Sequence, residues 1–436
     1  HRQRVKVWLL GEDARRSPEN LRQLEICRRL AIELAPIPAQ GFDAQLAPAT
    51  VIVDALFGVG LSREISGPWA EAIETANAHP AFKVAVDIPS GIHSDTGAIL
   101  GLALKADLTV TYAYPKWGHL LDPALDHIGR LEIVDIGIPP HYASDLPERL
   151  ITPALVRGWL PGPRPRAVHK GGMGRLGIVA GAMGMSGAAR MAAEAALQTG
   201  PGLVFLFVPA SIQDQLAVAL PEVQVVPLPE VAGQLGPAAL EILCRRLADM
   251  DALLIGPGLG RNPSVSELLA ALLPRLELPL VLDADALYHL AEQPRPFRHP
   301  VILTPHPGEL ARLLHCRGAE IQADRVPAAR EAAAALNAVT LLKGARSLVA
   351  TPDGEIYFNP SGNPGMARGG MGDVLAGLVA GLLAQGLAPA PAAGLACYWH
   401  GHAGDRVVAH LPEAALTVQR LLAALPEAWA SLASHS

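Results

Sequence analysis

The sequence predicts an α/β protein of two doubly wound units, each with helices on both faces of a parallel sheet. Three observations predict this. The 436 residues suit about two to three domains. Short apolar runs alternate with helical stretches along most of the chain, as in buried parallel sheets. Prolines at Pro139-Pro140 and from Pro161 to Pro165 interrupt this alternation, so we expect units of residues 1–145 and 146–436.

The composition narrows the possible functions. Half of the residues are hydrophobic and 17% are charged, which excludes a disordered chain. The 35 basic and 41 acidic residues give a net charge of −6, so we expect no nucleic-acid partner. The four cysteines lie far apart, which disfavours disulfides and zinc and favours the reducing cytoplasm. Glycines interrupt the longest apolar run, from Val374 to Ala384, so we expect a buried helix and no membrane span.

The elements of the first unit follow from their apolar patterns. Leu21, Leu24 and Ala31 have the spacing of an amphipathic helix, and runs rich in Val, Ile and Leu are typical of buried strands. We expect strands at 5–10, 50–55, 83–86, 108–112 and 131–134, and helices at 20–34 and 69–78.

The second unit repeats the alternation and ends in helices rich in alanine and leucine, which favour helix formation. Each of its strands runs into a Gly-rich or polar loop. In an open parallel sheet these loops lie at the carboxyl edge, where ligands bind. We expect strands at 176–180, 203–208, 252–255, 280–282, 301–303 and 339–342, and a helix at 188–199.

The segment from Gly362 to Gly377 carries the strongest functional signal. It reads Gly-Asn-Pro-Gly-Met-Ala-Arg-Gly-Gly-Met-Gly-Asp-Val-Leu-Ala-Gly, with glycines crowded before Asp373. Free amides at the start of a helix bind anions, whereas a carboxylate there would repel phosphate. We interpret Asp373 as the base that takes a proton from a hydroxyl attacking a phosphoryl group. Alternatively, Asp373 only complements the helix dipole.

Further strand ends of this unit carry candidate ligand contacts. Leu341-Leu-Lys-Gly-Ala-Arg-Ser347 suits a nucleotide, or is an ordinary strand end. Thr304-Pro-His-Pro-Gly-Glu309 holds a histidine rigidly for a ligand, or Glu309 simply begins a helix. Ile255-Gly-Pro-Gly-Leu-Gly260 lets a flat ligand lie on the backbone, or makes a tight turn. Asp283 and Asp285 either orient Mg²⁺ or cap the following helix.

Two strands of the first unit each end in an aspartate. Val51-Ile-Val-Asp54 leads into a Gly-rich turn, and Val84-Ala-Val-Asp87 leads into a turn containing Ser90. Because the carboxyl ends of parallel strands share an edge, these turns predict a ligand site. The alternative is a pair of helix N-caps.

The motifs of the second unit, preceded by His169-Lys-Gly, occur in an order that resembles the NAD(P)H-hydrate dehydratase family, of ribokinase-like fold. The resemblance covers about residues 150–436 and implies two substrates, hydrated NAD(P)H (NAD(P)HX) and ADP, with Mg²⁺. Arg368 departs from the small residue, such as Thr or Ser, that the family has there, and we expect it to add a phosphate contact or to alter nucleotide choice. The implied hydrate contacts are Ala188, Gly260, His306 and Asp373. The implied nucleotide contacts are Lys343, Gly344, Ala345, Arg346, Ser347 and Gly372.

The strand ends of the first unit, with Lys116-Trp-Gly118 and Asp135-Ile-Gly-Ile-Pro139, resemble the Rossmann-like NAD(P)H-hydrate epimerase domain. This domain interconverts the R and S hydrates for an S-specific dehydratase. The resemblance implies K⁺ held by Asp54 and Ser90, and assigns no role to Lys116. The implied hydrate contacts are Gly58, Val59, Gly60, Leu61, Ser62, Arg63, Glu64 and Asp87.

The family's epimerase domain begins with a segment that carries an Asn-Asn-Gly-Gly-Asp-Gly loop, and no such loop occurs in this sequence, whose predicted strand at 5–10 matches the strand that should follow that segment. We therefore expect a bifunctional repair enzyme truncated at its N-terminus, with an incomplete epimerase site. The alternatives are a ribokinase-like kinase of the hydroxymethylpyrimidine type and, for the first unit, a binding or assembly module. The resemblance also implies a homo-oligomer.

Overall fold

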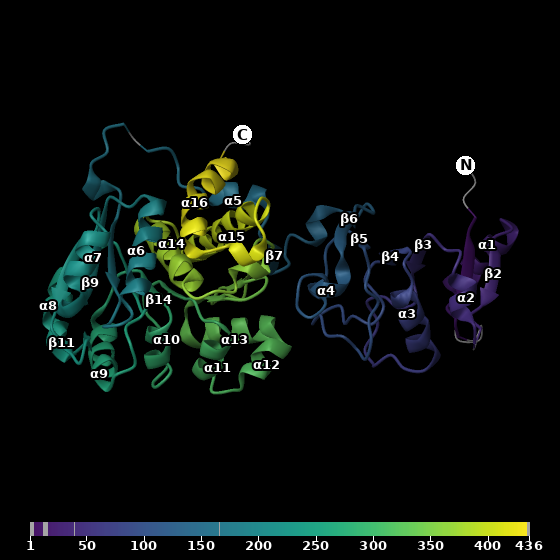
Figure 1. The fold of residues 1–436 in the computed structure, drawn as a ribbon, viewed down its shortest axis with the longest axis horizontal. Helices are drawn as coiled ribbons and strands as arrows, with labels where there is room; N and C mark the ends of the chain where they lie inside the picture. Colours follow the sequence, from purple (N-terminus) through teal and green to yellow (C-terminus); the bar gives the residue numbers. More distant parts are fainter. Residues whose placement is uncertain (1–3, 12–15, 39, 165, 434–436) are drawn as a thin grey trace. The chain divides into compact units, whose positions relative to one another are not determined.

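The computed structural model describes residues 4–11, 16–38, 40–164 and 166–433. The chain forms two compact units, His1–Ser144 and Asp145–Ser436. Both units are α/β, with helices between parallel strands, which confirms the predicted α/β class (Figure 1). Within these ranges, every helix is too short or too polar to span a bilayer.

The first unit contains two parallel sheets. Its elements are β1 (Lys6–Leu9), α1 (Pro18–Arg29), β2 (Glu33–Pro36), α2 (Phe42–Leu46), β3 (Val51–Asp54), α3 (Pro68–Ala78), β4 (Phe82–Val86), β5 (Leu108–Tyr112), the 3₁₀ turn η2 (Trp117–His119), α4 (Leu125–Ile128) and β6 (Arg130–Val134). β1 pairs with β2, and a separate sheet has the order β3-β4-β5-β6. The helix expected over 20–34 ends at Arg29, because Ala31 turns the chain into β2 with a left-handed φ of 54°.

One face of the four-stranded sheet is largely uncovered. Ile73 of α3 packs with Ala85 of β4 in a small core on the other face. Parallel strands that follow one another in order keep their right-handed crossovers on one side. Val51 and Val53 are therefore 52% and 61% exposed, so the double cover expected from the sequence is not complete here.

The second unit is built on a ten-stranded sheet with the order β10-β9-β8-β13-β14-β15-β16-β17-β18-β7. Its strands are β7 (Glu148–Leu150), β8 (Arg175–Val179), β9 (Leu203–Pro209), β10 (Gln224–Leu228), β13 (Ala252–Ile255), β14 (Leu280–Leu282), β15 (Val301–Leu303), β16 (Val339–Leu342), β17 (Leu348–Ala350) and β18 (Ile356–Phe358), beside the hairpin of β11 (Glu230–Val231) and β12 (Gln234–Leu235). The sheet is parallel from β10 to β16, and β17 is antiparallel to both neighbours. The order reverses between β8 and β13, which is where ligands bind in such sheets.

Helices cover both faces of this sheet. They are α5 (Pro153–Trp159), α6 (Ser186–Thr199), α7 (Gln213–Ala219), α8 (Leu240–Leu247), α9 (Pro263–Leu272), α10 (Asp285–Leu290), α11 (Pro307–Leu313), α12 (Gly318–Ala323), α13 (Arg325–Leu336), α14 (Met371–Ala384), α15 (Pro389–Val408) and α16 (Val418–Ala433). Successive side chains of β13 enter opposite cores: Leu254 packs with α6, α14 and α15, and Leu253 with α8, α9 and α10. Because successive side chains of a strand point to opposite faces of the sheet, the two leucines enter different cores. The apolar run 374–384 forms the buried helix α14, as expected.

Candidate active sites

The glycine-rich segment before Asp373 is fixed to α15. The carboxylate of Asp405 accepts hydrogen bonds from the Gly362 amide and from the side-chain amide of Asn363, both at 2.9 Å. Gly370 directly precedes α14 and has a φ of 94°, a left-handed conformation that favours glycine. Amides in the first turn of a helix lack acceptors within it and can bind an anion. Sequence reasoning missed Asp405, because nothing near it in the chain signals this contact.

Asp373 lies in the first turn of α14, where other charged groups surround it. Burial and the nearby carboxylates of Asp283 and Asp285 together raise the pKa of its carboxyl to about 6, against the opposing charge of Lys343. A carboxylate with this pKa is ionised at neutral pH and accepts protons more readily than an ordinary aspartate. The position therefore suits a general base.

Lys343 connects the nucleotide motif to the glycine-rich turn. Its Nζ donates to Asp283 Oδ1 at 2.7 Å and lies 3.9 Å from Glu309 Oε2. A Cβ at Gly372 would lie 3.4 Å from Nζ, so the ammonium reaches the start of α14. Burial alone would lower the pKa of Lys343, but Asp283 and Glu309 outweigh burial and raise it. The side chain is therefore a fixed positive charge at the anion-binding turn.

The loop 343–347 is held by an arginine that the sequence did not single out. Arg325 of α13 is 5% exposed. Its guanidinium donates to the carbonyl oxygens of Ala345 at 2.6 Å, Lys343 at 3.3 Å and Leu342 at 3.4 Å. Ser347 Oγ closes the loop by donating to the carbonyl oxygen of Gly344 at 3.2 Å. An arginine inside a helical pattern gives no local sign of such a role.

His306 caps helix α11. Its Nδ1 accepts the amides of Gly308 at 3.0 Å and Glu309 at 3.3 Å, and Glu309 Oε2 accepts the His306 amide at 2.8 Å. The helix that the sequence offered as the structural alternative is present, but it begins at Pro307 and Glu309 lies in its first turn. The His306 side chain remains 57% exposed, so a ligand can also reach it. Burial raises the pKa of Glu309 to about 7.

The Gly-Pro-Gly-Leu-Gly turn meets the start of α6. A Cβ at Gly258 would lie 3.0 Å from the Cβ of Ala188, so these two sequence motifs are neighbours. Asp285 accepts the Gly260 amide and Arg261 Nε, both at 2.9 Å. The carboxylate of Asp285 is therefore engaged in positioning this turn.

The aspartates considered for Mg²⁺ already have protein partners. Asp283 Oδ1 accepts Thr304 Oγ1 and Lys343 Nζ, both at 2.7 Å. Among the described residues, no group of three or more His, Cys, Asp or Glu side chains is arranged to hold a metal ion. These residues do not form a metal cage, and Asp283 acts as the anchor for Lys343.

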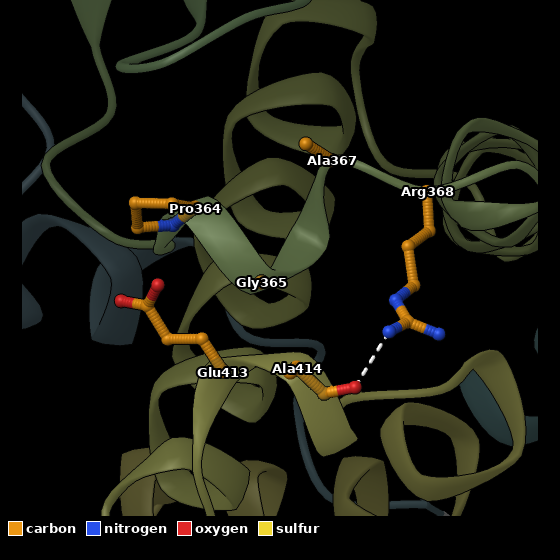
Figure 2. Close-up of a pocket in the computed structure, with 6 residues that line it drawn as sticks. All are labelled: Pro364, Gly365, Ala367, Arg368, Glu413 and Ala414. Carbon is orange, nitrogen blue, oxygen red and sulfur yellow. Dashed lines mark hydrogen bonds between the residues drawn. The ribbon is translucent and has the colours of Figure 1, made fainter.

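Arg368 borders a hollow of about 210 Å³ beside the glycine-rich turn (Figure 2). Its Nη2 donates to the carbonyl oxygen of Ala414 at 2.5 Å, across from the 3₁₀ turn η8 (Pro364–Met366). Figure 2 shows the guanidinium directed toward Ala414, with Glu413 extending to the opposite side of the hollow. The arginine thus links the turn to η9 (Glu413–Ala415).

In the first unit, Asp54 and Ser90 join the ends of β3 and β4. Asp54 accepts the Ser90 amide at Oδ2 and the Ser90 hydroxyl at Oδ1, both at 2.7 Å. Ser90 Oγ accepts the Phe57 amide at 2.9 Å. Burial raises the pKa of Asp54 against these hydrogen bonds. The two oxygen-bearing residues implied as K⁺ ligands are therefore brought together.

The loop of residues 58–64 follows β3 at the same edge. Most of it is exposed, but Leu61 is 8% exposed and packs in the core beneath α3. Ser94 Oγ donates to the carbonyl oxygen of Val59 at 3.3 Å. Within this loop, the side chain of Leu61 supports the structure, and only its main chain remains for a ligand.

Asp87 directly follows β4 and is paired with Lys116. Lys116 Nζ donates to Asp87 Oδ1 at 2.5 Å, and Thr111 Oγ1 donates to the same oxygen at 2.9 Å. Burial favours a higher pKa for Asp87, but these hydrogen bonds outweigh it and lower the pKa below its ordinary value. Sequence reasoning left Lys116 without a role and did not single out Thr111.

Family models match both units. A model described as NAD(P)H-hydrate dehydratase matches residues 176–427, and a model described as YjeF-related protein N-terminus matches residues 1–118. The chain is 44% identical to a bifunctional NAD(P)H-hydrate repair enzyme of Moorella thermoacetica, over 97% of this chain and 81% of that protein. A protein of the same name from Salinibacter ruber is 39% identical, over 96% and 79%.

A solved structure resembles the second unit. It is the ADP/ATP-dependent NAD(P)H-hydrate dehydratase of Bacillus subtilis, co-crystallised with ATP and Mg²⁺. The match has a TM-score of 0.57 and 33% identity, and covers 65% of this chain and 98% of that one. A ribokinase-like protein of Enterococcus faecalis matches with a TM-score of 0.58 and 28% identity, over 66% and 97%.

Proposed function

The chain belongs to the family of bifunctional NAD(P)H-hydrate repair enzymes, and from this premise we propose that it restores hydrated NADH and NADPH to the intact cofactors. The second unit dehydrates the (S)-hydrate at the expense of a nucleotide, and the first unit interconverts the R and S hydrates. The alternative small-molecule kinase is not favoured, because the family match and the curated relatives both name hydrate chemistry.

The dehydratase proposal depends chiefly on one observation: Asp373 lies in the first turn of α14, next to the fixed ammonium of Lys343. The hydrate carries a hydroxyl on C6, and hydroxide is a poor leaving group. Asp373 takes the hydroxyl proton while the oxygen attacks the terminal phosphoryl group of the nucleotide. Phosphate then leaves C6 as the ring nitrogen supplies its electron pair, and loss of a C5 proton gives NAD(P)H.

The remaining residues of the second unit bind the two substrates in this proposal. Ala188, Gly260 and His306 contact the hydrate, while the loop 343–347 and Gly372 contact ADP. The support for a nucleotide is the relative from Bacillus subtilis, which is named as ADP/ATP-dependent. Mg²⁺ neutralises phosphate charge when bound. It would be held mainly by phosphate oxygens, as is usual for this ion, because the aspartates at the site already have protein partners.

The first unit binds the hydrate through residues 58–64 and Asp87 in this proposal. Asp54 and Ser90 supply oxygens for K⁺, which their convergence at the ends of β3 and β4 supports. We also include a cytoplasmic location, which the four free cysteines support, and a homo-oligomer, which light scattering would test.

The test uses the purified chain, mixed R and S NADHX, Mg²⁺ and either ADP or ATP, with absorbance at 340 nm as the readout. Recovery of NADH with ADP, abolished in Asp373→Ala, is the expected result. A plateau at the S fraction would mean that the first unit does not epimerise. Absence of recovery with both nucleotides would contradict the dehydratase proposal.

A further inference from the structure

The ammonium of Lys116 lies at the carboxyl edge of the four-stranded sheet. Besides Asp87 Oδ1, it donates to Thr111 Oγ1 at 2.8 Å and to the carbonyl oxygen of Tyr112 at 3.3 Å. The side chains of Lys116 and Asp87 are 25% and 20% exposed, so the pair is largely enclosed but accessible. Ala113, which follows Tyr112 in the chain, lines a hollow of about 220 Å³. The other residues that line this hollow are Tyr114, Ile133, Asp135 and Ile138.

The main chain around this pair is held rigidly. Asp87 has a left-handed φ of 68°, a conformation that is uncommon outside glycine and concentrates at functional sites. His119 is 2% exposed, and its Nδ1 accepts the Lys116 amide at 3.0 Å while its Nε2 lies 2.8 Å from the Asp87 carbonyl oxygen. Burial lowers the pKa of His119 to about 4, so the ring is neutral and Nε2 is the donor. His119 therefore fixes the main chain of both members of the pair.

We propose that Lys116 and Asp87 form the acid–base pair that epimerises the hydrate, an inference that rests on the epimerase function proposed above. The stereocentre of the hydrate is C6, which carries both a hydroxyl and the ring nitrogen N1. A carbon of this kind inverts when the bond to nitrogen opens and closes again on the other face. One group must take a proton from the oxygen, and another must give a proton to the nitrogen.

The opening step balances as a proton relay. Asp87 takes the hydroxyl proton, the O–H electron pair forms the C6 carbonyl, and the C6–N1 pair moves to N1. The Lys116 ammonium protonates N1. After rotation about C5–C6, N1 attacks the opposite face of the carbonyl, Lys116 recovers its proton from N1, and Asp87 returns its proton to the oxygen. Nothing is oxidised or reduced, and no co-reactant is consumed.

The geometry of the pair matches this task. The oxygen and N1 are bonded to the same carbon, and the acid and base that would serve them lie 2.5 Å apart. Asp87 is kept ionised by Lys116 and Thr111, as a base requires. Thr111 donates to Asp87, His119 contacts the main chain of both residues, and Asp87 has a left-handed main chain, a combination that is typical of a functional site.

In the full chain, NADH recovery by the second unit reports on epimerisation by the first unit. With mixed NADHX, ADP and Mg²⁺, the S hydrate is consumed in a first phase of NADH recovery, and the R hydrate follows in a second phase limited by epimerisation. We expect Lys116→Met to slow the second phase by at least about 100-fold, toward the rate in buffer, and to leave the first unchanged. The control is Lys105→Met, which alters an exposed lysine of the same unit and should leave both phases unchanged.

Lys116→Arg separates acid chemistry from structure. Arginine keeps the charge and can donate to Asp87, but it does not give up its proton, so the second phase should remain as slow as in Lys116→Met. Recovery of the second phase in Lys116→Arg would mean that Lys116 only anchors Asp87, and would overturn the assignment. A wild-type second phase no faster than buffer would instead overturn the epimerase function, and this inference with it.

Discussion

Each unit has an aspartate among its predicted site residues, Asp87 directly after β4 and Asp373 in the first turn of α14, and the acidity of the two carboxyls is shifted in opposite directions. In the second unit, burial and the neighbouring carboxylates of Asp283 and Asp285 raise the pKa of Asp373 to about 6. In the first unit, Lys116 and Thr111 lower the pKa of Asp87 against the effect of burial. The neighbouring charged and polar groups therefore determine the strength of each base.

Asp373→Asn tests this comparison with the largest expected effect. The amide cannot accept the hydroxyl proton, so NADH recovery from (S)-NADHX should fall by about 10²–10⁴-fold. The thermal midpoint should not fall, since the substitution removes a charge that the folded protein disfavours. Epimer exchange, measured by chromatography of the R and S hydrates, should be unchanged. Loss of both activities would mean that the two units do not act independently.

Gly256→Ala tests the support of the dehydratase site. Gly256 has a φ of 138°, and a Cβ there would lie 1.7 Å from the carbonyl oxygen of Asp283, so the main chain that places the anchor of Lys343 must shift. We expect a loss of about 2–4 kcal/mol in the free energy of unfolding of the second unit, measured by urea denaturation.

The control for Gly256→Ala is Gly318→Ala, because a Cβ at Gly318 meets no atom within 4 Å. Gly318 lies at the start of α12, and alanine should leave stability unchanged or raise it slightly. Equal losses in the two variants would contradict the contact at Asp283 as the cause.

The pH dependence should differ between the two activities. Asp373 must be ionised to accept a proton, so kcat/KM for dehydration should be constant above about pH 7 and fall as pH drops through about 6, reaching roughly tenfold per unit below it. Epimerisation should persist to lower pH, because the pKa of Asp87 is lowered. Stopped assays from pH 5 to 8 would measure both. Parallel profiles would contradict the difference in base strength.

The sequence was sufficient to predict the α/β class and most strands, because buried parallel strands are continuous apolar runs. It did not predict the remaining strands, which are short or partly exposed: β2, β7, β10, β11, β12, β17 and β18. The sequence also predicted that the motifs at the ends of parallel strands lie at the same edge of the sheet, because the direction of the strands alone places them there. The uncovered face of the first unit was not foreseen, because strand order is not encoded in any local pattern.

The supporting residues of the sites were harder to predict. Arg325 and Asp405 lie within helices and contact loops about 20 and 40 residues away. His119 acts through its two ring nitrogens on main-chain atoms, which no motif reports. Sequence reasoning finds the residues whose chemistry stands out locally, whereas positioning residues are defined by tertiary contacts.

Arg368→Ser has the smallest expected effect. It tests what the arginine does at a position where the family has a small residue. If the arginine bound phosphate, its loss would weaken nucleotide binding at least tenfold, and more strongly at low salt. The structure instead directs Nη2 to the carbonyl oxygen of Ala414, and a hydrogen bond at an exposed residue contributes about 0.5–1.5 kcal/mol. We therefore expect KM for ADP to change by less than about threefold, with no dependence on salt. A tenfold, salt-dependent rise would make Arg368 a phosphate ligand and extend the charged site of the second unit beyond Lys343.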